Sequence, residues 1–292
     1  MAGFRACVLG DNHARQLLTP DRPDPDSMTP DLIFDIGMHQ GEDTDFYLRK
    51  GFRVVAVDAN PDLCDRNAHR FEREIQDGRL TIVNAAIAEK AGKVRFYLNY
   101  CRSDWGTLYE SLVRRNERRG SPGHRPIEVE SLRPETLFEK YGIPYYMKVD
   151  IEGADWICLQ ALGHVHELPR YISVENDKPV RQVRQLAKLG YYRFKIVSQR
   201  SVPEQREPTP PIEGRAANIH FQLGSSGLFG GDLPGTWMTK DEATRVASKV
   251  AISQKIVGLE GLVRQSWPAL IRTPIERLFW RGFHWFDIHA AR

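Results

Sequence analysis

The amino-acid sequence predicts an α/β protein built on a seven-stranded open sheet, mostly parallel with an antiparallel last strand, and with helices on both faces. From residue 31 onward, short apolar runs alternate with segments of helical periodicity. The apolar runs show little polar alternation, which is typical of parallel strands buried on both faces. Near the end of this region two strands are joined by a loop rather than a helix, which predicts an antiparallel edge pair.

The first half of the predicted sheet comes from two strand–helix pairs and a third strand. The strands are predicted at 32–36, 53–58 and 79–87. The first helix covers 43–51 and ends at Gly51, since glycine is common just after a helix C-terminus. The second helix covers 61–75 with Pro61 in its first turn, where the missing amide hydrogen of proline does no harm.

An insertion then interrupts the regular alternation. Segments 93–99 and 126–132 alternate apolar and polar residues like half-exposed strands, and residues 100–125 lie between them. Within this insertion, 113–125 holds five arginines and one glutamate. The basic segment is interpreted either as a solvated loop or as a rim that faces an anionic substrate, and the insertion as a lid over the acceptor.

The sheet pattern resumes after the insertion and continues to residue 223. The further strands are predicted at 145–150, 170–175, 192–198 and 216–223, and the helices at 153–163 and 179–190. A proline-rich loop separates the last two strands, so the final strand is expected to be the antiparallel one.

Three regions are expected along the chain. Residues 1–30 are polar and carry four prolines, which predicts a poorly ordered arm. Residues 31–223 form the sheet domain, and 224–292 a glycine-rich loop with a C-terminal helical extension, its helices at 239–251 and from 268 onward. The last helix has an apolar face, interpreted as packed against its own domain, with a peripheral membrane-surface or dimer contact as the alternative.

Composition and motifs exclude several classes of protein. A formal net charge of +3 gives no reason to expect a nucleic-acid partner. The four cysteines include no CxxC pair and no zinc-ligand spacing with histidine, so a reducing, cytoplasmic location is expected. No apolar stretch of signal-peptide or transmembrane length occurs, so we expect neither secretion by that route nor a membrane span.

The exit of the first strand, "DIGMHQG" (35–41), has the features of a nucleotide-binding turn in a Rossmann-like sheet. Gly37 permits a tight turn and close approach of a ligand to the backbone. Asp58 closes the second strand 21 positions after Gly37. A carboxylate at that spacing suits the two hydroxyls of an adenosine ribose.

Two cofactors carry such a ribose, and the turn discriminates between them. The pyrophosphate of NAD needs a G-x-G-x-x-G turn, but His39 and Glu42 stand where the second and third glycines would be. Glu42 would repel a phosphate and tolerate a cationic sulfonium or ammonium group. The turn therefore favours S-adenosyl-L-methionine. An NAD-dependent sugar oxidoreductase or epimerase, and a non-catalytic binding module on the same fold, are the alternatives.

Acidic side chains gather at the ends of the later strands. In "YYMKVDIEGADW", Lys148 and Asp150 share one face of a strand, and Glu152 follows in its exit. The segment "ISVEND" delivers Glu175 and Asn176 to the same edge of the sheet. This arrangement predicts a site, with a mutually satisfied Lys–Asp pair as the structural alternative. Oxygen ligands could hold a hard cation there, but nothing in the spacing requires one, and no metal is predicted.

Five segments in this order and spacing resemble the FkbM family of S-adenosylmethionine-dependent methyltransferases: "DIGMHQGEDT", "VVAVDANPDL", "VNAAIAEKAGKVRFY", "MKVDIEGAD" and "ISVEND". The resemblance covers roughly 31–223. It implies an O-methyltransferase that acts on hydroxyls of sugars, glycans or natural products. It also implies that Gly37 and Gly41 form the cofactor turn, that Asp58 contacts the ribose, and that Asp150 and Glu152 lie under the transferred methyl.

The sequence departs from this family at two positions. His39 stands where the family commonly has asparagine, and Asp155 where it has a final glutamate. His39 is therefore left open as a cofactor contact or a base on the substrate side.

Roles are assigned to the remaining candidates as follows. The candidates for the catalytic base are Asp150 and Glu175, with Lys148 or His39 behind them. The residues expected to bind the donor are Asp35, Gly37, Gly41, Asp58, Asn84, Ala85 and Glu152. Asn84 and Ala85 would lie along an adenine edge, unless Asn84 merely ends its strand. Those expected to bind a small-molecule or glycan acceptor, anionic in one interpretation, are Trp105, Arg114 and Arg115. A lid packed by its own aromatic residues is the alternative for this last group.

Overall fold

The computed structural model describes residues 28–257 and 285–292. It divides into two compact units, which meet in sequence between Pro169 and Arg170. The predicted arm lies outside the described residues except for its last three, which belong to the first strand. The helix predicted from 268 onward also lies outside them, up to residue 284.

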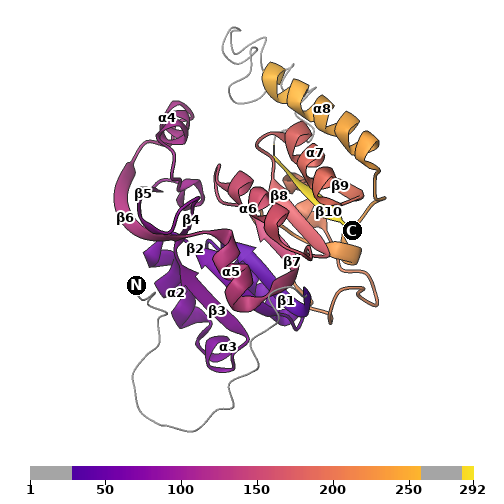
Figure 1. Ribbon diagram of the computed structural model, residues 1–292, viewed down its shortest axis with the longest axis horizontal. Coiled ribbons are helices and arrows are strands. Elements are labelled where there is room, and N and C mark those ends of the chain that lie inside the picture. Colours follow the sequence, from indigo (N-terminus) through magenta and orange to yellow (C-terminus); the bar gives the residue numbers. More distant parts are fainter. Residues whose placement is uncertain (1–27, 258–284) are drawn as a thin grey trace. The chain divides into compact units, whose positions relative to one another are not determined.

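The first unit contains four parallel strands in the order β3-β2-β1-β7 (Figure 1). Their bounds are β1 Met28–Ile36, β2 Arg53–Asp58, β3 Leu80–Asn84 and β7 Ile143–Val149. The central strands are apolar and buried on both faces, with Ile33, Phe34 and Ile36 fully buried. This confirms the parallel sheet that the uninterrupted apolar runs predict.

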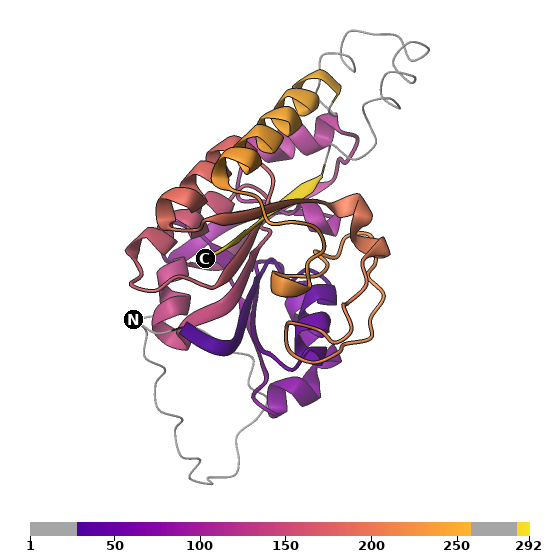
Figure 2. The same ribbon diagram turned by 90° about the vertical axis from the view of Figure 1, so that its right-hand side faces the viewer.

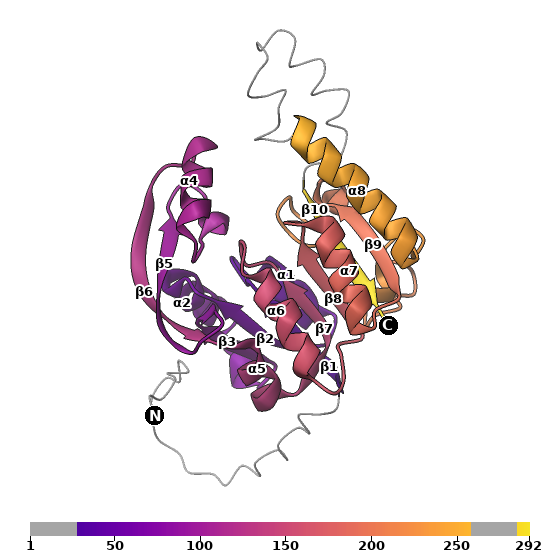
Figure 3. The same cartoon turned by 45° about the horizontal axis from the view of Figure 1, so that its top comes forward.

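Helices cover both faces of these strands. They are α1 Glu42–Arg49, α2 Pro61–Arg70, α3 Glu72–Gln76, α5 Pro134–Tyr141 and α6 Asp155–Ala161. Phe34 stacks on Phe138 of α5 with ring centroids 6.0 Å apart, and Tyr146 meets Tyr47 of α1 edge-on at 5.7 Å. Because Tyr146 pairs with Ile33 and not with Phe34, α1 and α5 pack on opposite faces. Figure 3 shows α5 and α6 side by side next to β7.

A small second sheet forms the rest of this unit. Its strands are β4 Ala86–Ile87, β5 Gly92–Asn99 and β6 His124–Leu132, in the order β4-β6-β5. The strand predicted at 79–87 is therefore two strands in two sheets: β3 pairs with β2 as far as Asn84, and β4 pairs with β6 from Ala86. The insertion between β5 and β6 holds a short 3-10 helix, η1 Ser103–Trp105, and α4 Glu110–Arg118.

The second unit adds β8, β10 and β9 to the strand order, giving the seven-stranded sheet. The bounds are β8 Tyr171–Glu175, β9 Arg193–Ser198 and β10 Phe286–Ala291. Two long helices, α7 Pro179–Leu189 and α8 Lys240–Val257, pack against each other, and Figure 2 shows α8 running along α7. Three short 3-10 helices complete the described chain at Leu162–His164, Gln199–Glu204 and Gly230–Asp232.

The antiparallel last strand is present, but the sequence analysis placed it on the wrong residues. Residues 216–223 form no strand. The amides of Ala217 and Asn218 donate instead to the Glu207 carboxylate at 2.9–3.3 Å, and Asn218 has a positive φ of 51°. The strand is β10, whose six residues are all buried and pair antiparallel with both β8 and β9. A central strand such as β10 has backbone hydrogen bonds on both edges, whereas two amides of 216–223 are bound by the Glu207 side chain instead.

Candidate active site

The turn after β1 touches the end of β7. Gly37 has a φ of 92°, and a Cβ atom at this position would lie 1.8 Å from the carbonyl oxygen of Asp150. No side chain fits there, so the glycine is required both by the backbone conformation and by the close approach. The Asp150 amide donates to Ile36 O at 2.9 Å, which locks the two strand ends together.

The amides of this turn are used within the protein. Those of Gly37 and Met38 both donate to Val57 O at 2.9 and 3.1 Å, and that of Gly41 donates to Met38 O at 2.9 Å. The His39 amide donates to Asp58 Oδ2 at 2.8 Å. Gly41 then begins α1 in a left-handed conformation with φ 79°. The turn therefore presents a folded backbone with these four donors already taken.

Asp58 ends β2 beside the same turn. Its Oδ2 accepts from the His39 amide and its Oδ1 from the Asn60 amide, both at 2.8 Å. Burial raises the pKa of this carboxyl, and the two backbone hydrogen bonds oppose that rise. Each oxygen keeps a second lone pair for a ligand. Gly37, Asp58 and Asp150 are thus brought to one place, as the strand-end argument predicts.

Asn84 and Ala85 adjoin Asp58 at the end of β3. Asn84 pairs with Asp58 in the ladder, and its side-chain amide donates to Asp58 O at 3.0 Å and to Cys64 Sγ at 3.3 Å. The Ala85 amide also donates to Asp58 O at 3.0 Å. Both residues therefore lie next to the ribose candidate, and the Asn84 side chain holds the strand end in place.

A buried cluster of charged side chains lies next to the glycine turn and contacts its backbone. Lys148 Nζ lies 3.1 Å from Asp35 Oδ1 and 3.6 Å from Asp43 Oδ2, and it donates to Gly37 O at 2.7 Å. Thr44 Oγ1 donates to Asp35 Oδ2 at 2.6 Å. Burial opposes the charge on Lys148, but the two carboxylates outweigh it and hold the pKa of the amine well above its usual value. The charge of Lys148 is therefore satisfied, but by Asp35 and Asp43 of other elements and not by Asp150 of its own strand, as the structural alternative had it.

The turn that leaves β7 concentrates three carboxyls at Asp150, Glu152 and Asp155. Burial raises the pKa of all three, and for Asp155 to about 7. Asp155 begins α6, and its oxygens accept from the amides of Ile151 at 3.4 Å and Gly153 at 3.2 Å. Glu152 has a positive φ of 41°, which is uncommon outside glycine. The turn is acidic, tightly wound and strained at one residue.

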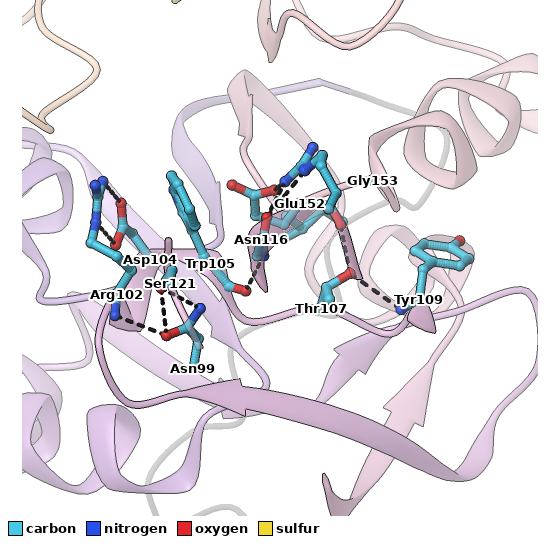
Figure 4. A network of polar contacts seen from close by, with 12 residues as sticks. Asn99, Arg102, Asp104, Trp105, Thr107, Tyr109, Asn116, Ser121, Glu152 and Gly153 are labelled. Atoms are coloured by element: carbon cyan, nitrogen blue, oxygen red, sulfur yellow. Dashed lines mark hydrogen bonds and ion pairs between the residues drawn. The ribbon is translucent and has the colours of Figure 1, made fainter. Parts of the chain in front are cut away.

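The insertion reaches this turn from the other side (Figure 4). Arg115 Nη2 lies 2.8 Å from Glu152 Oε2, and Thr107 Oγ1 donates to Glu152 O at 3.0 Å. In Figure 4 the indole of Trp105 stands between the Arg102–Asp104 pair and Glu152, and the Arg102 guanidinium lies 4.6 Å from its ring. The insertion also touches the glycine turn, because Ser103 Oγ lies 2.8 Å from His39 Nε2.

Of the remaining predicted residues, one is exposed on α4 and the other belongs to the second unit. Arg114 is on the solvent side of α4, with 62% of its side chain exposed and Glu110 at 3.6 Å. Glu175 ends β8 in the second unit, where its carbonyl accepts from Gln182 Nε2 at 2.6 Å. The first unit holds the other predicted residues: Asp35, Gly37, His39, Gly41, Asp58, Asn84, Ala85, Trp105, Arg115, Lys148, Asp150 and Glu152.

Sequence reasoning missed the residues that join separate elements: Asp43, Thr44, Ser103, Thr107 and Asn116. For Asp43 and Thr44 the sequence shows one unusual pattern: both are polar but share a helix face with the apolar Tyr47. The structure buries both side chains on that face. Thr107 and Asn116 carry no such local signal. Their partners are Glu152 and Trp105, and only the folded chain brings them together.

The described residues contain neither a group of metal ligands nor a membrane-spanning helix. Within 28–257 and 285–292, no three His, Cys, Asp or Glu side chains are grouped so that they could hold a metal ion. None of the helices in this part of the chain is long and apolar enough to cross a membrane.

Comparison with known proteins identifies the family. The model of the methyltransferase FkbM domain matches residues 35–192, which is more than half of the chain. Among solved structures, one match is the methyltransferase FkbM from Methylobacillus flagellatus, at 13% identity and a TM-score of 0.39, over 58% of this chain and 40% of that one. No curated protein matched the chain. The family match and the strand-end cluster lie on the same residues, and the chain belongs to the FkbM methyltransferase family.

Proposed function

We propose that this protein is an S-adenosyl-L-methionine-dependent O-methyltransferase that acts on a hydroxyl of a sugar, glycan or natural product. The observation that carries the proposal is that the backbone amides of the glycine turn are already hydrogen-bonded. Its amides at Gly37, Met38, His39 and Gly41 are donated within the protein. A pyrophosphate needs several such amides free, so the turn suits an adenosyl ligand without phosphate better than NAD.

The residues around the turn fit the parts of that donor. Asp58, held by two backbone amides, is placed to accept from the ribose hydroxyls. Asn84 and Ala85 continue the same rim toward an adenine. Asp150 and Glu152 supply negative charge for a cationic sulfonium and ammonium group. Because both carboxyls are partly shielded from water, they would balance a bound cation more strongly than exposed groups do.

When bound, S-adenosyl-L-methionine supplies an electrophilic methyl group on a positively charged sulfur. The protein must align the acceptor oxygen, exclude water and remove the hydroxyl proton. Asp150 is our candidate for the base, because burial raises the pKa of its carboxyl toward the range in which it can take up a proton. Lys148 is less suited, since two carboxylates hold its amine in the charged form. His39 is the second candidate, at the contact with Ser103.

The pairing of two arginines in the insertion supports an uncharged acceptor. Arg102 is neutralised by Asp104 at 2.6 Å and Arg115 by Glu152 at 2.8 Å. Trp105 adds a flat apolar surface beside these pairs. An acceptor held by ring faces and hydroxyls fits such a surface without displacing either ion pair.

Ligand-dependent thermal unfolding tests the donor. S-adenosylhomocysteine at about 100 times its dissociation constant should stabilise the protein by about 2.7 kcal/mol, and NAD should not. Stabilisation by NAD alone would support the oxidoreductase alternative, and no response to either ligand would support a binding module. A panel of hydroxyl-bearing acceptors, read by mass spectrometry, should then show a gain of one methyl group on oxygen.

The variant Asp150→Asn tests the base. We expect methyl transfer to fall by about 10²–10⁴-fold, the usual contribution of a positioned base, while the affinity for S-adenosylhomocysteine stays within a few-fold of the wild type. His39→Gln is the matched comparison, since it removes the second candidate. Normal turnover in Asp150→Asn, together with a large loss in His39→Gln, would move the role to the histidine.

A further inference from the structure

The insertion is fastened to the turn after β7 by three contacts at Glu152 and Gly153. Arg115 pairs with the Glu152 carboxylate at 2.8 Å, and Thr107 donates to the Glu152 carbonyl at 3.0 Å. A Cβ atom on Gly153 would lie 2.7 Å from Leu112 Cδ1, so α4 packs directly on the turn. A charge pair, a hydrogen bond from a side-chain hydroxyl to a backbone carbonyl, and a packing contact thus fix the turn from the insertion.

Other residues fix the Arg115 side chain in the orientation in which it pairs with Glu152. Its Nε and Nη2 donate to Asn116 Oδ1 at 3.1 and 3.0 Å. Asn116 is fully buried, and its amide donates to Trp105 O at 3.3 Å. Only 20% of the Arg115 side chain and 13% of the Glu152 side chain are exposed. The guanidinium is therefore preorganised, and the pair is shielded from water.

Glu152 combines an uncommon backbone conformation with a carboxylate that needs a partner. Its φ is 41°, which non-glycine residues rarely adopt. Burial and the neighbouring carboxylates raise the pKa of Glu152, and Arg115 opposes them. The charged groups that face Glu152 are Arg115 from α4, Arg102 and Asp104 from η1, and Asp150 and Asp155 from its own turn.

We propose that Arg115 is a positioning residue for methyl transfer, which holds the Glu152 carboxylate and its turn in the arrangement that binds a cationic donor. The inference rests on the proposed function and deepens it, since it gives the insertion a part in donor binding. In this role Arg115 acts through the Glu152 carboxylate and not by a contact of its own with the donor.

Calorimetric binding of S-adenosylmethionine to the full chain from pH 6 to 9.5 tests this role. In Arg115→Met we expect affinity to fall about 10–100-fold at pH 7, the range for a lost hydrogen bond to a charged group. Affinity should recover as pH rises, because Glu152 without its partner ionises at higher pH. Arg115→Lys should keep the pH midpoint of the wild type. Arg118→Met, which removes an exposed arginine from the same helix, should bind like the wild type.

The pH midpoint of binding distinguishes positioning of the Glu152 carboxylate from a simple loss of packing. A uniform loss of affinity in Arg115→Met, with an unchanged midpoint, would overturn the proposal, as would a shifted midpoint in Arg115→Lys. If Arg115→Met does not unfold cooperatively, Glu152→Gln decides: the pH dependence that belongs to Glu152 should vanish, and binding like the wild type at every pH would refute the role. A wild type that binds no S-adenosylmethionine would sink the proposed function itself.

Discussion

Each unit contains a buried strand lysine, and the two amines have opposite surroundings. Lys148 of β7 lies within ion-pair distance of Asp35 and Asp43, which hold its pKa well above the usual value. Lys195 of β9 donates to Leu233 O and lies 4.5 Å from the ring of Trp237. Burial lowers the pKa of Lys195 to about 8. In the ladder it pairs with His289 of β10, whose pKa burial and the lysine charge lower to about 3.

The difference shows that burial alone does not decide the charge of a lysine. Both side chains are at most 5% exposed. Around Lys148 the carboxylates outweigh the loss of water, whereas a carbonyl and an indole do not outweigh it around Lys195. The first lysine is a fixed cation beneath the glycine turn. The second is an amine that can lose its proton at mildly alkaline pH.

Removing each lysine should give the largest contrast. Lys148→Met leaves Asp35 and Asp43 buried without their cation, so we expect a loss of about 3–5 kcal/mol in the free energy of unfolding. Lys195→Met loses one hydrogen bond and a cation–π contact, about 1–2 kcal/mol. Urea unfolding at pH 7 measures both. Equal losses would show that the acids do not depend on Lys148.

A buried carboxyl with no neighbouring cation should prefer its uncharged form in the folded state, whereas Lys148 keeps its charge. Asp155 has a pKa of about 7 in the fold and 3.8 as its ordinary value, so the folded state holds a proton that the unfolded chain releases. Wild-type stability should therefore fall relative to Asp155→Asn as pH rises from about 4 to 7. Thermal unfolding across that range checks it, with Asp177→Asn, an exposed acid, as a control that stays flat.

At alkaline pH the two lysines should affect the pH dependence of stability differently. Between about pH 8 and 10, folded Lys195 has released its proton while the unfolded side chain, with an ordinary pKa of 10.5, keeps it. Wild-type stability should rise relative to Lys195→Met over this range. The difference between wild type and Lys148→Met should stay constant there, because Lys148 is charged in both states. A parallel rise in both comparisons would contradict the assignment.

An exposed ion pair gives the smallest expected effect. Arg114 and Glu110 lie 3.6 Å apart with 62% and 63% of their side chains exposed. Arg114→Ala should change the free energy of unfolding by less than about 0.5 kcal/mol, since water screens the pair. Urea unfolding at low and high salt measures it. A loss of several kcal/mol would mean that charge on this helix matters in a way that exposure does not predict.

Local sequence patterns were enough to predict the site residues that lie at the end of a single strand. Gly37 follows β1 and Asp58 ends β2, and parallel neighbours place both at one edge. The pairing of Lys148 with Asp35 was not predicted, because it depends on the register of β1 against β7. Asp43 could not be assigned to that cluster, since the angle of α1 on the sheet decides which helical residue meets the amine.

The sequence by itself determined the parallel strands, the glycine turn and the acidic strand ends, because each depends on residues close together in the chain. Tertiary structure alone decided that β10 would enter between β8 and β9, displacing the strand predicted at 216–223. It also decided that Arg115 would meet Glu152, 37 residues away. Such contacts are chosen by the total burial and hydrogen bonding of the folded chain, which no local pattern contains.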